Sequence, residues 1–262
     1  MNDQIIGLQD WFKTPPGRYL LAWEGAQLDL AVANIFGFHA LQLGLTELDA
    51  LALNRMPHRW LATHAPAPGA TLVANFSALP FPANSLDLVV MPHSLELAPD
   101  PHATLREVER ILVPEGRVVI CGLNPVSLWG FRQRRAQLYH RLGFGHSFLP
   151  QDEFIGYWRL RDWLRLLGFE VELGQFGCYR PALSSEKWLQ RFEWMDHAGD
   201  RWWPILGAVY FLTAVKRVRG MTLLTPAWKN SRALASAPVS VANNTALTRA
   251  AGLDDKNVRS SD

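Results

Sequence analysis

The chain has 262 residues, a formal net charge of +2 and a hydrophobic fraction of 48%, with 11 Trp and 13 Phe. This length suits one α/β domain with an appendage, and the apolar content excludes a chain that is disordered throughout. The small net charge disfavours a wholly basic nucleic-acid-binding domain.

The first 75 residues predict two helices and three short strands. Leucine, valine and isoleucine recur at helical spacing in the helices, and the strands are short apolar runs. In chain order, the predicted ranges are a helix over 10–36, a strand over 38–43, a helix over 45–53 and strands over 59–63 and 71–75. Pro15, Pro16 and Gly17 interrupt the start of the first helix.

The middle of the chain predicts a βαβ unit. Residues 86–91 are nearly all apolar, as expected of a strand covered on both faces. Asp100 followed by Pro101 is a good helix start, with an acidic N-cap before proline at the first helical position. A strand over 117–121 follows this helix, so the two strands are expected to be parallel with a right-handed crossover.

The rest of the chain predicts a helix, a strand, a helical excursion, a final strand and a tail. Leu160, Trp163, Leu164 and Leu167 form a helical stripe that ends at Gly168. The predicted ranges are 160–167 for this helix, 169–173 for the strand, 181–204 for the helical excursion and 208–215 for the final strand. A disordered tail is predicted over 221–262. The expected organisation is therefore a helical segment over 1–36, one domain over 37–220 and the tail.

Cysteine content and the first residues indicate a compartment. Cys121 and Cys178 give no disulfide framework, which favours a reducing cytoplasm. The chain begins without the basic start and apolar block of a signal peptide, and no apolar run approaches the roughly 18 residues of a membrane span. We expect a cytoplasmic protein without a transmembrane segment.

Several short motifs between residues 79 and 116 occur together at defined spacings. They are Leu79-Pro80-Phe81, Asn84-Ser85-Leu86-Asp87, Leu95-Glu96, Asp100-Pro101, Leu105-Arg106-Glu107, Arg110, Leu112, Pro114 and Gly116. This combination resembles the second half of the catalytic domain of class I S-adenosylmethionine-dependent methyltransferases, especially the type 11 subgroup. The resemblance covers about residues 36–218. It implies an α/β, Rossmann-like doubly wound sheet of seven strands, mostly parallel, with an antiparallel last strand inserted between the fifth and sixth.

The resemblance also implies a cofactor, S-adenosylmethionine, bound at the end of the first strand. In the family a glycine-rich loop lets the backbone approach the methionine part of the cofactor, where a Cβ would collide. Gly44 matches the first glycine, Thr46 replaces the next, and Gln42 stands where an acidic residue is usual.

The adenosine half of the expected site departs further from the family. A carboxylate normally accepts the ribose hydroxyls at the end of the second strand, where this chain has His64. Asn75 stands where an aspartate commonly accepts from the adenine amino group, and its amide oxygen can do the same without charge. The resemblance places Phe76 and Met91 beside the cofactor as well.

The connection between the second and third strands is short. Only residues 65–70 separate the two strand candidates, and they include Pro66 and Pro68. A parallel crossover with a helix needs about ten or more residues. Either the usual helix is missing, or the two segments pair as a hairpin.

Candidate groups for chemistry follow the fourth and fifth strands, because open α/β sheets bind ligands at the carboxyl ends of their strands. Methyl transfer from a sulfonium needs in-line positioning more than a special nucleophile. His93 is placed to be a base or a substrate contact, or is a loop histidine without a catalytic role. Asn124 is placed to cap the pocket, or belongs to an ordinary turn.

A basic stretch follows the fifth strand. No acidic residue lies between Glu115 and Asp152, whereas Arg132, Arg134 and Arg135 fall in this interval together with aromatic side chains. In the family this segment often covers the acceptor, so Arg132 and Arg135 are candidate contacts of an anionic acceptor. The alternative is a solvated helix face with aromatic side chains docked inward.

The histidines show no metal-ligand spacing backed by cysteines or carboxylates, and the i, i+3 pair of His93 and Glu96 lies in a predicted loop, so no metal site is expected. The predicted function is S-adenosylmethionine-dependent methyl transfer to a small or anionic acceptor. The alternative is a catalytically silent methyltransferase-like binding or partner module. A nucleic-acid or membrane-surface binder that uses the arginine stretch is less favoured.

Overall fold

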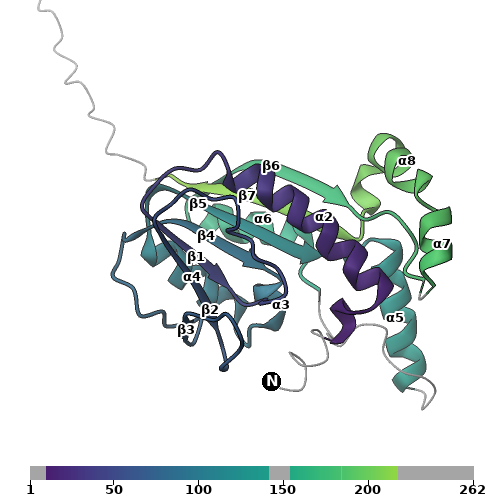
Figure 1. Ribbon diagram of the computed structural model, residues 1–262, viewed down its shortest axis with the longest axis horizontal. Helices are drawn as coiled ribbons and strands as arrows, with labels where there is room; N and C mark the ends of the chain where they lie inside the picture. Colours follow the sequence, from purple (N-terminus) through teal and green to yellow (C-terminus); the bar gives the residue numbers. More distant parts are fainter. Residues whose placement is uncertain (1–9, 142–153, 184, 218–262) are drawn as a thin grey trace, which may run out of the picture. The chain divides into compact units, whose positions relative to one another are not determined.

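Within residues 10–141, 154–183 and 185–217, which the computed structural model describes, seven strands form one sheet in the order β3-β2-β1-β4-β5-β7-β6 (Figure 1). The strands are β1 (His39–Leu43), β2 (His58–Thr63), β3 (Leu72–Val73), β4 (Leu86–Pro92), β5 (Leu112–Leu123), β6 (Phe169–Gly177) and β7 (Val209–Lys216). The helices are α2 (Pro15–Val32), α3 (Ser94–Leu97), α4 (Pro101–Ile111), α5 (Leu128–Arg141), α6 (Tyr157–Leu166), α7 (Glu186–Arg191) and α8 (Trp194–Trp202), with a 3₁₀ turn at Pro204–Leu206.

The strand order confirms the predicted fold class. β1 pairs in parallel with β2 and with β4, and β4 pairs in parallel with β5. β7 is antiparallel to both β5 and β6, between which it lies. The predicted tail over 221–262 lies outside the described residues.

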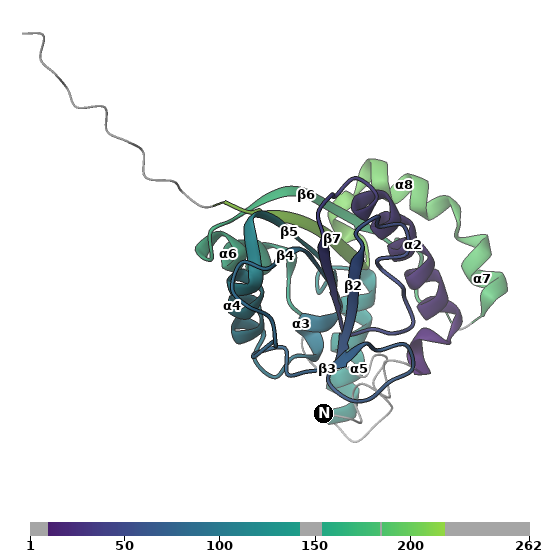
Figure 2. The same ribbon diagram turned by 60° about the vertical axis from the view of Figure 1, so that its left-hand side comes forward.

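Helices cover both faces of the sheet (Figure 2). On one face, Leu28 and Val32 of α2 pack against Val90 of β4 and Val119 of β5. On the other face, α4 and α6 pack against the alternate residues of the same strands. Fully burying a leucine or valine side chain contributes about 1.5–3 kcal/mol, so these two layers account for much of the driving force for folding.

The helix that was expected over 10–36 is shorter in the structure. Thr14 is its N-cap, since the Thr14 side chain accepts a hydrogen bond from the Gly17 backbone N–H, and prolines occupy the first two helical positions. Proline suits these positions because their N–H groups have no partner within the helix. The prolines therefore begin α2 rather than interrupt it.

The helix predicted over 45–53 is wrong. These residues form a loop of turns, which the Gln42 side chain holds. The Gln42 Nε2 group donates to the carbonyl oxygens of Leu45 and Leu48, both at 2.7 Å, and Gln42 Oε1 accepts from the Ala50 N–H at 2.9 Å. Leu45 and Leu51 are still buried, so their spacing reflects the packing of a loop.

The segments on either side of residues 65–70 are parallel strands. Ala62 pairs with Leu72 and Thr63 pairs with Val73 in a parallel register. The first alternative from the sequence is thus correct: the crossover lacks its helix, and no hairpin forms.

The predicted βαβ unit is confirmed, and its second strand is longer than expected. The Asp100 side chain accepts from the Ala103 N–H at 2.9 Å and caps α4. β5 begins at Leu112, directly after α4, rather than at residue 117. The helix predicted over 160–167 is α6, and Gly168 follows it with φ +84°.

Candidate functional site

Gly44 lies where β1 ends, between two other loops at the carboxyl edge of the sheet. Its φ is +73°, and its N–H donates to the Ala62 carbonyl at 2.8 Å. A Cβ at this position would lie 3.2 Å from Ser94 Oγ and 3.8 Å from the Phe76 ring. The Ser94 hydroxyl itself donates to the Leu43 carbonyl. Gly44 therefore occupies a narrow cradle whose walls come from the loops after β3 and β4.

His64 lies beside this cradle, one residue after β2. Its ring packs against Phe76, with the ring centroids 3.7 Å apart. Its Nε2 atom is buried and has no hydrogen-bond partner within the described part of the chain. Burial lowers the pKa of His64, so the imidazole is neutral near pH 7 and presents one nitrogen as an acceptor.

Asn75 precedes Phe76 and is exposed. Its Oδ1 atom accepts from the Ser77 N–H at 3.0 Å, which stabilises the turn that brings Phe76 toward Gly44. An amide oxygen has two lone pairs, so Asn75 keeps one for a ligand. Of the residues that the sequence proposed for the cofactor, the structure thus brings Gly44 and His64 together around Phe76, and Asn75 directly precedes Phe76 in the chain.

The other three proposed cofactor residues lie elsewhere. The Gln42 amide is occupied by the loop described above. Thr46 lines a different hollow, next to Gln42 and the Arg59 side of β2. Met91 is fully buried in the hydrophobic core, where its side chain packs within the layer under α4.

His93 is the centre of a buried ionic cluster. Its Nε2 atom lies 2.9 Å from Glu24 Oε1 of α2, and its Nδ1 atom lies 2.9 Å from Glu96 Oε2 of α3. His93 is 1% exposed and Glu24 is 0% exposed. The backbone of His93 has φ +53°, a left-handed conformation that is uncommon outside glycine. Both ring nitrogens face carboxylates, so in this geometry neither is directed at a substrate.

The ionisable groups of this cluster shift one another's pKa values. Burial alone lowers the pKa of His93, but the carboxylates of Glu24 and Glu96 outweigh it and raise that pKa to about 10. Burial raises the pKa of Glu96, although its contacts with His93 and the Leu123 N–H act in the opposite direction. The Leu123 N–H donates to Glu96 Oε1 at 2.5 Å. The cluster consequently joins α2 to the ends of β4 and β5.

The residues proposed for the acceptor follow β5. Asn124 is buried, and its Nδ2 group donates to the carbonyls of Ile205 at 2.7 Å and Gly207 at 2.8 Å. Arg132 donates to the Ala182 carbonyl. Arg134 and Arg135 are exposed on α5. Asn124 thus joins the segment between β5 and α5 to later residues, Arg132 joins α5 itself to Ala182, and Arg134 and Arg135 are exposed.

Glu24 and Ser94 were not singled out from the sequence. Glu24 shares the apolar face of α2 with Leu20 and Leu28, each four residues away. A carboxylate in the middle of such a face needs a buried partner. The position of Glu24 on an apolar helix face could therefore have shown that it has a buried partner, but not that this partner is His93.

The described residues contain neither a metal site nor a membrane-spanning helix. They contain no group of three or more His, Cys, Asp or Glu side chains arranged to hold a metal ion. None of the described helices has the length and apolarity needed to cross a membrane.

Residues 30–120 match the family model of a methyltransferase domain. The chain is similar to the uncharacterized protein YafS of Escherichia coli (strain K12), with 27% identity over 84% of this chain and 85% of that protein. It is also similar to a demethylmenaquinone methyltransferase of Anoxybacillus flavithermus, with 34% identity over 38% of this chain and 48% of that enzyme.

Two solved structures have the same fold. A SAM dependent methyltransferase from Archaeoglobus fulgidus superimposes with a TM-score of 0.52 at 16% identity, over 75% of this chain and 94% of that one. A possible histamine N-methyltransferase from Thermotoga maritima superimposes with a TM-score of 0.50 at 16% identity, over 76% and 93% of the two chains.

Proposed function

We propose that this chain, which belongs to the class I S-adenosylmethionine-dependent methyltransferase family, binds S-adenosylmethionine through Gly44, His64, Asn75 and Phe76 and transfers its methyl group to an acceptor. One observation carries the proposal. The buried, unpartnered Nε2 atom of His64 lies at the end of β2, the position at which the family places its ribose-binding carboxylate.

The residues present fit this cofactor, but with fewer and weaker hydrogen bonds than the family's usual set of residues makes. A neutral His64 accepts one hydrogen bond from a ribose hydroxyl, where a carboxylate accepts two. Gly44 lets the ligand approach the backbone, and the free lone pair of Asn75 accepts from the adenine amino group. Weaker, uncharged hydrogen bonds predict a dissociation constant in the tens to hundreds of micromolar.

When bound, the cofactor supplies an electrophilic methyl group on a sulfonium, and the protein supplies position and a dry site. In this proposal His93 is a positioning residue. Its two ion pairs hold the turn that carries Ser94, and Ser94 forms one wall of the Gly44 cradle.

Removing the His64 acceptor is expected to weaken cofactor binding. His64→Leu should raise the dissociation constant about 3–10-fold, because losing a neutral hydrogen bond costs about 0.5–1.5 kcal/mol. Calorimetric titration with S-adenosylmethionine and S-adenosylhomocysteine measures this dissociation constant. His58→Leu is the matched control, because His58 starts β2 and is exposed at the opposite end of that strand. Equal affinities for the two variants would remove His64 from the site.

The acceptor is proposed to be anionic and to approach α5. Arg134 and Arg135 are exposed on this helix, within a segment that has no acidic residue from 116 to 151. Guanidinium groups bind phosphate and carboxylate oxygens with paired hydrogen bonds. Because Arg132 donates to the Ala182 carbonyl, the two exposed arginines are better placed for an acceptor than Arg132.

The double replacement of Arg134 and Arg135 with Ala is expected to weaken binding of tripolyphosphate several-fold and to reduce its salt dependence. The melting temperature should stay the same, because exposed charges contribute little to stability. Arg106→Ala, at an exposed position of α4, is the control. If parent and double variant bind tripolyphosphate equally at low salt, α5 is not an anion site.

One set of observations favours the alternative, a catalytically silent module. The helices that usually follow the first two strands are absent from the described residues, and Gln42 is committed to the loop that replaces one of them. The same calorimetric titration separates the two functions. No heat and no thermal shift with millimolar S-adenosylmethionine or S-adenosylhomocysteine would leave the silent module as the remaining function.

A further inference from the structure

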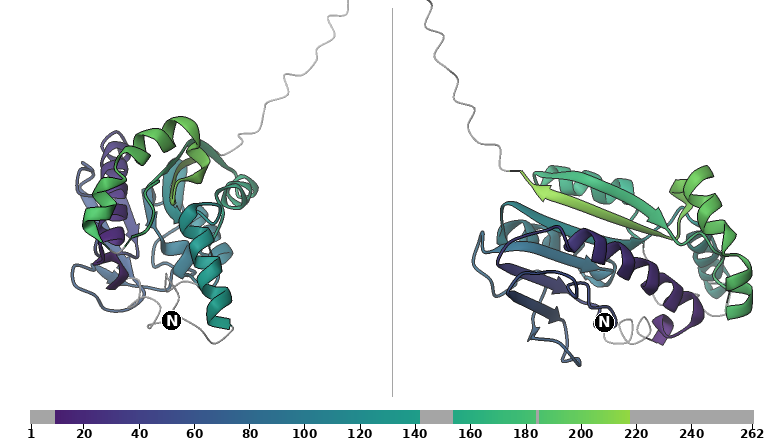
Figure 3. Two further views of the ribbon diagram at one scale, coloured as in Figure 1. Left: turned by 90° about the vertical axis from the view of Figure 1, so that its right-hand side faces the viewer. Right: turned by 45° about the horizontal axis from the view of Figure 1, so that its top comes forward.

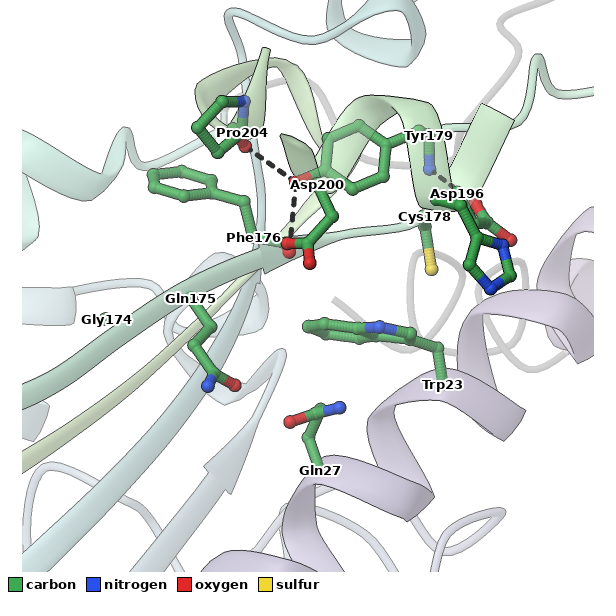
Figure 4. A pocket seen from close by; sticks show the side chains of 11 residues that line it. Trp23, Gln27, Gly174, Gln175, Phe176, Cys178, Tyr179, Asp196, Asp200 and Pro204 are labelled. Carbon is green, nitrogen blue, oxygen red and sulfur yellow. Dashed lines mark hydrogen bonds between the residues drawn. The ribbon is translucent and has the colours of Figure 1, made fainter. Parts of the chain in front are cut away.

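A hollow of about 450 Å³ lies between α2, β6 and α8, away from the Gly44 cradle. Figure 4 shows the side chains that surround it, and Figure 3 shows green α7 and α8 beyond the carboxyl end of β6. Its principal lining residues are Trp23, Gln27, Gln175, Phe176, Asp196 and Asp200. None of these residues belongs to the proposed cofactor site.

Close backbone packing fixes the walls of this hollow. A Cβ at Gly177 would overlap the Trp23 indole, so the ring rests directly on the β6 backbone. A Cβ at Gly199 would overlap the Tyr179 ring, so α8 lies against that ring in the same way. The Tyr179 hydroxyl donates to the Pro204 carbonyl at 2.9 Å. Trp23 is thereby held in one orientation, with part of its surface facing the hollow (Figure 4).

Some polar side chains of the hollow already form hydrogen bonds within the protein, and others form none within the described residues. Asp196 accepts from the Tyr19 hydroxyl, from the Tyr179 N–H at 3.2 Å and from Arg180 Nε at 2.8 Å. Asp200, one helical turn further, has no hydrogen bond or ion pair within the described residues, and neither do the amides of Gln27 and Gln175.

The charge of the hollow is negative. Arg180 pairs with Asp196, Asp200 has no ion pair within the described residues, and the lining includes His197 but no lysine or arginine. Figure 4 shows the Gln27 and Gln175 amides directed into the space beside the Trp23 ring. Asp200 and Gln175 are exposed, and a carboxylate alone would be ordinary surface chemistry, but here it lines the same hollow as a fixed aromatic ring and two amides able to donate and accept.

We propose that this hollow binds a small organic ammonium ion that carries an apolar group. The ammonium would pair with Asp200 and interact with the Trp23 ring, since an aromatic face attracts a cation through its quadrupole. The apolar group would contact Phe176 and the remaining indole surface, and the glutamine amides would accept the other ammonium protons. The site is independent of the proposed methyl transfer.

Three probes of similar shape test the charge preference: benzylammonium, benzyl alcohol and benzoate. Titrated into the full chain at low ionic strength, benzylammonium is expected to bind at least about 10-fold more tightly than benzyl alcohol, and benzoate to bind least. Asp200→Asn should weaken benzylammonium binding about 5–10-fold and leave benzyl alcohol unchanged. Asp162→Asn, which removes an exposed carboxylate from α6, should have no effect.

Trp23→Phe keeps an aromatic ring and should weaken benzylammonium binding less than Asp200→Asn does. His64→Leu should leave benzylammonium binding unchanged, so failure of this site and failure of the cofactor site can be told apart. Equal binding of the three probes, a preference for benzoate, no binding of benzylammonium, or unchanged binding in Asp200→Asn would each overturn the proposal.

Discussion

Replacing His93 with glutamine is expected to lower the free energy of unfolding by about 3–5 kcal/mol at pH 7.5. The variant leaves the carboxylates of Glu24 and Glu96 buried close together without a cation between them. Urea unfolding followed by circular dichroism measures the loss. Glu24→Gln should cost less, because it leaves His93 and Glu96 as a pair of opposite charges. Equal losses in the two variants would contradict the charge assignment of the cluster.

The pH dependence has a definite sign. The pKa of His93 is raised from an ordinary 6.5 to about 10, so its stabilising contribution is fully present below pH 6.5 and is lost as the pH rises through 10. The raised pKa of Glu96 acts in the same direction, since its stabilising contribution also belongs to the lower pH. The parent protein should therefore lose stability between pH 6.5 and 10. The penalty of His93→Gln should shrink as the pH falls from 7.5 to 5, because the raised pKa of Glu96 lets that buried carboxyl take up a proton.

Gly44→Val is expected to abolish detectable binding of S-adenosylmethionine. The added side chain would stand over the backbone that the cofactor is proposed to approach, and its Cβ would also lie 3.2 Å from Ser94 Oγ, closer than an ordinary contact. The same calorimetric titration measures the loss. The left-handed backbone also makes valine unfavourable at this position, with a cost of about 1–3 kcal/mol.

Gly168→Val is the matched control for that backbone cost. Gly168 has φ +84°, and among the described residues a Cβ there would meet only the Arg217 carbonyl, at 3.7 Å. We expect both variants to be destabilised and only Gly44→Val to lose the cofactor. Retained binding in Gly44→Val would show that the cofactor does not approach this backbone.

Local chemistry in the sequence was sufficient for most of the scaffold. Asp100 and Pro101 together define the start of α4, and the apolar run of β4 defines a strand buried on both sides. These signals depend on residues close together in the sequence, which is why the βαβ unit could be predicted from them, whereas the order of all seven strands was implied by the resemblance to the methyltransferase family. The leucines after Gly44 led to a wrong prediction of a helix over 45–53, because buried residues in a loop can have the same spacing as those on one face of a helix.

The site depends on contacts between residues far apart in the sequence, which local patterns do not encode. Glu24 meets His93 across 69 positions, and Asn124 donates to a carbonyl 83 positions later. Position after a strand predicted His64 and Asn75 as neighbours of Gly44, and in the structure His64 and Gly44 both lie beside Phe76. The position of a residue after a strand gave no information on whether its side chain already has a partner within the protein. Such partners exist for the side chains of Gln42, His93, Asn124 and Arg132.

The position of β7 constrains how the chain can fold during synthesis. Among the described strands, β7 is the last to be synthesised, and it pairs on one side with β5 and on the other with β6. Until residues 209–216 are available, both partners have an open edge, and an unpaired edge is a template for intermolecular pairing. β6 has no other strand partner in the described sheet. Completion of the sheet is therefore a late step in folding, and a nascent chain that stalls before Val209 is the form most exposed to aggregation.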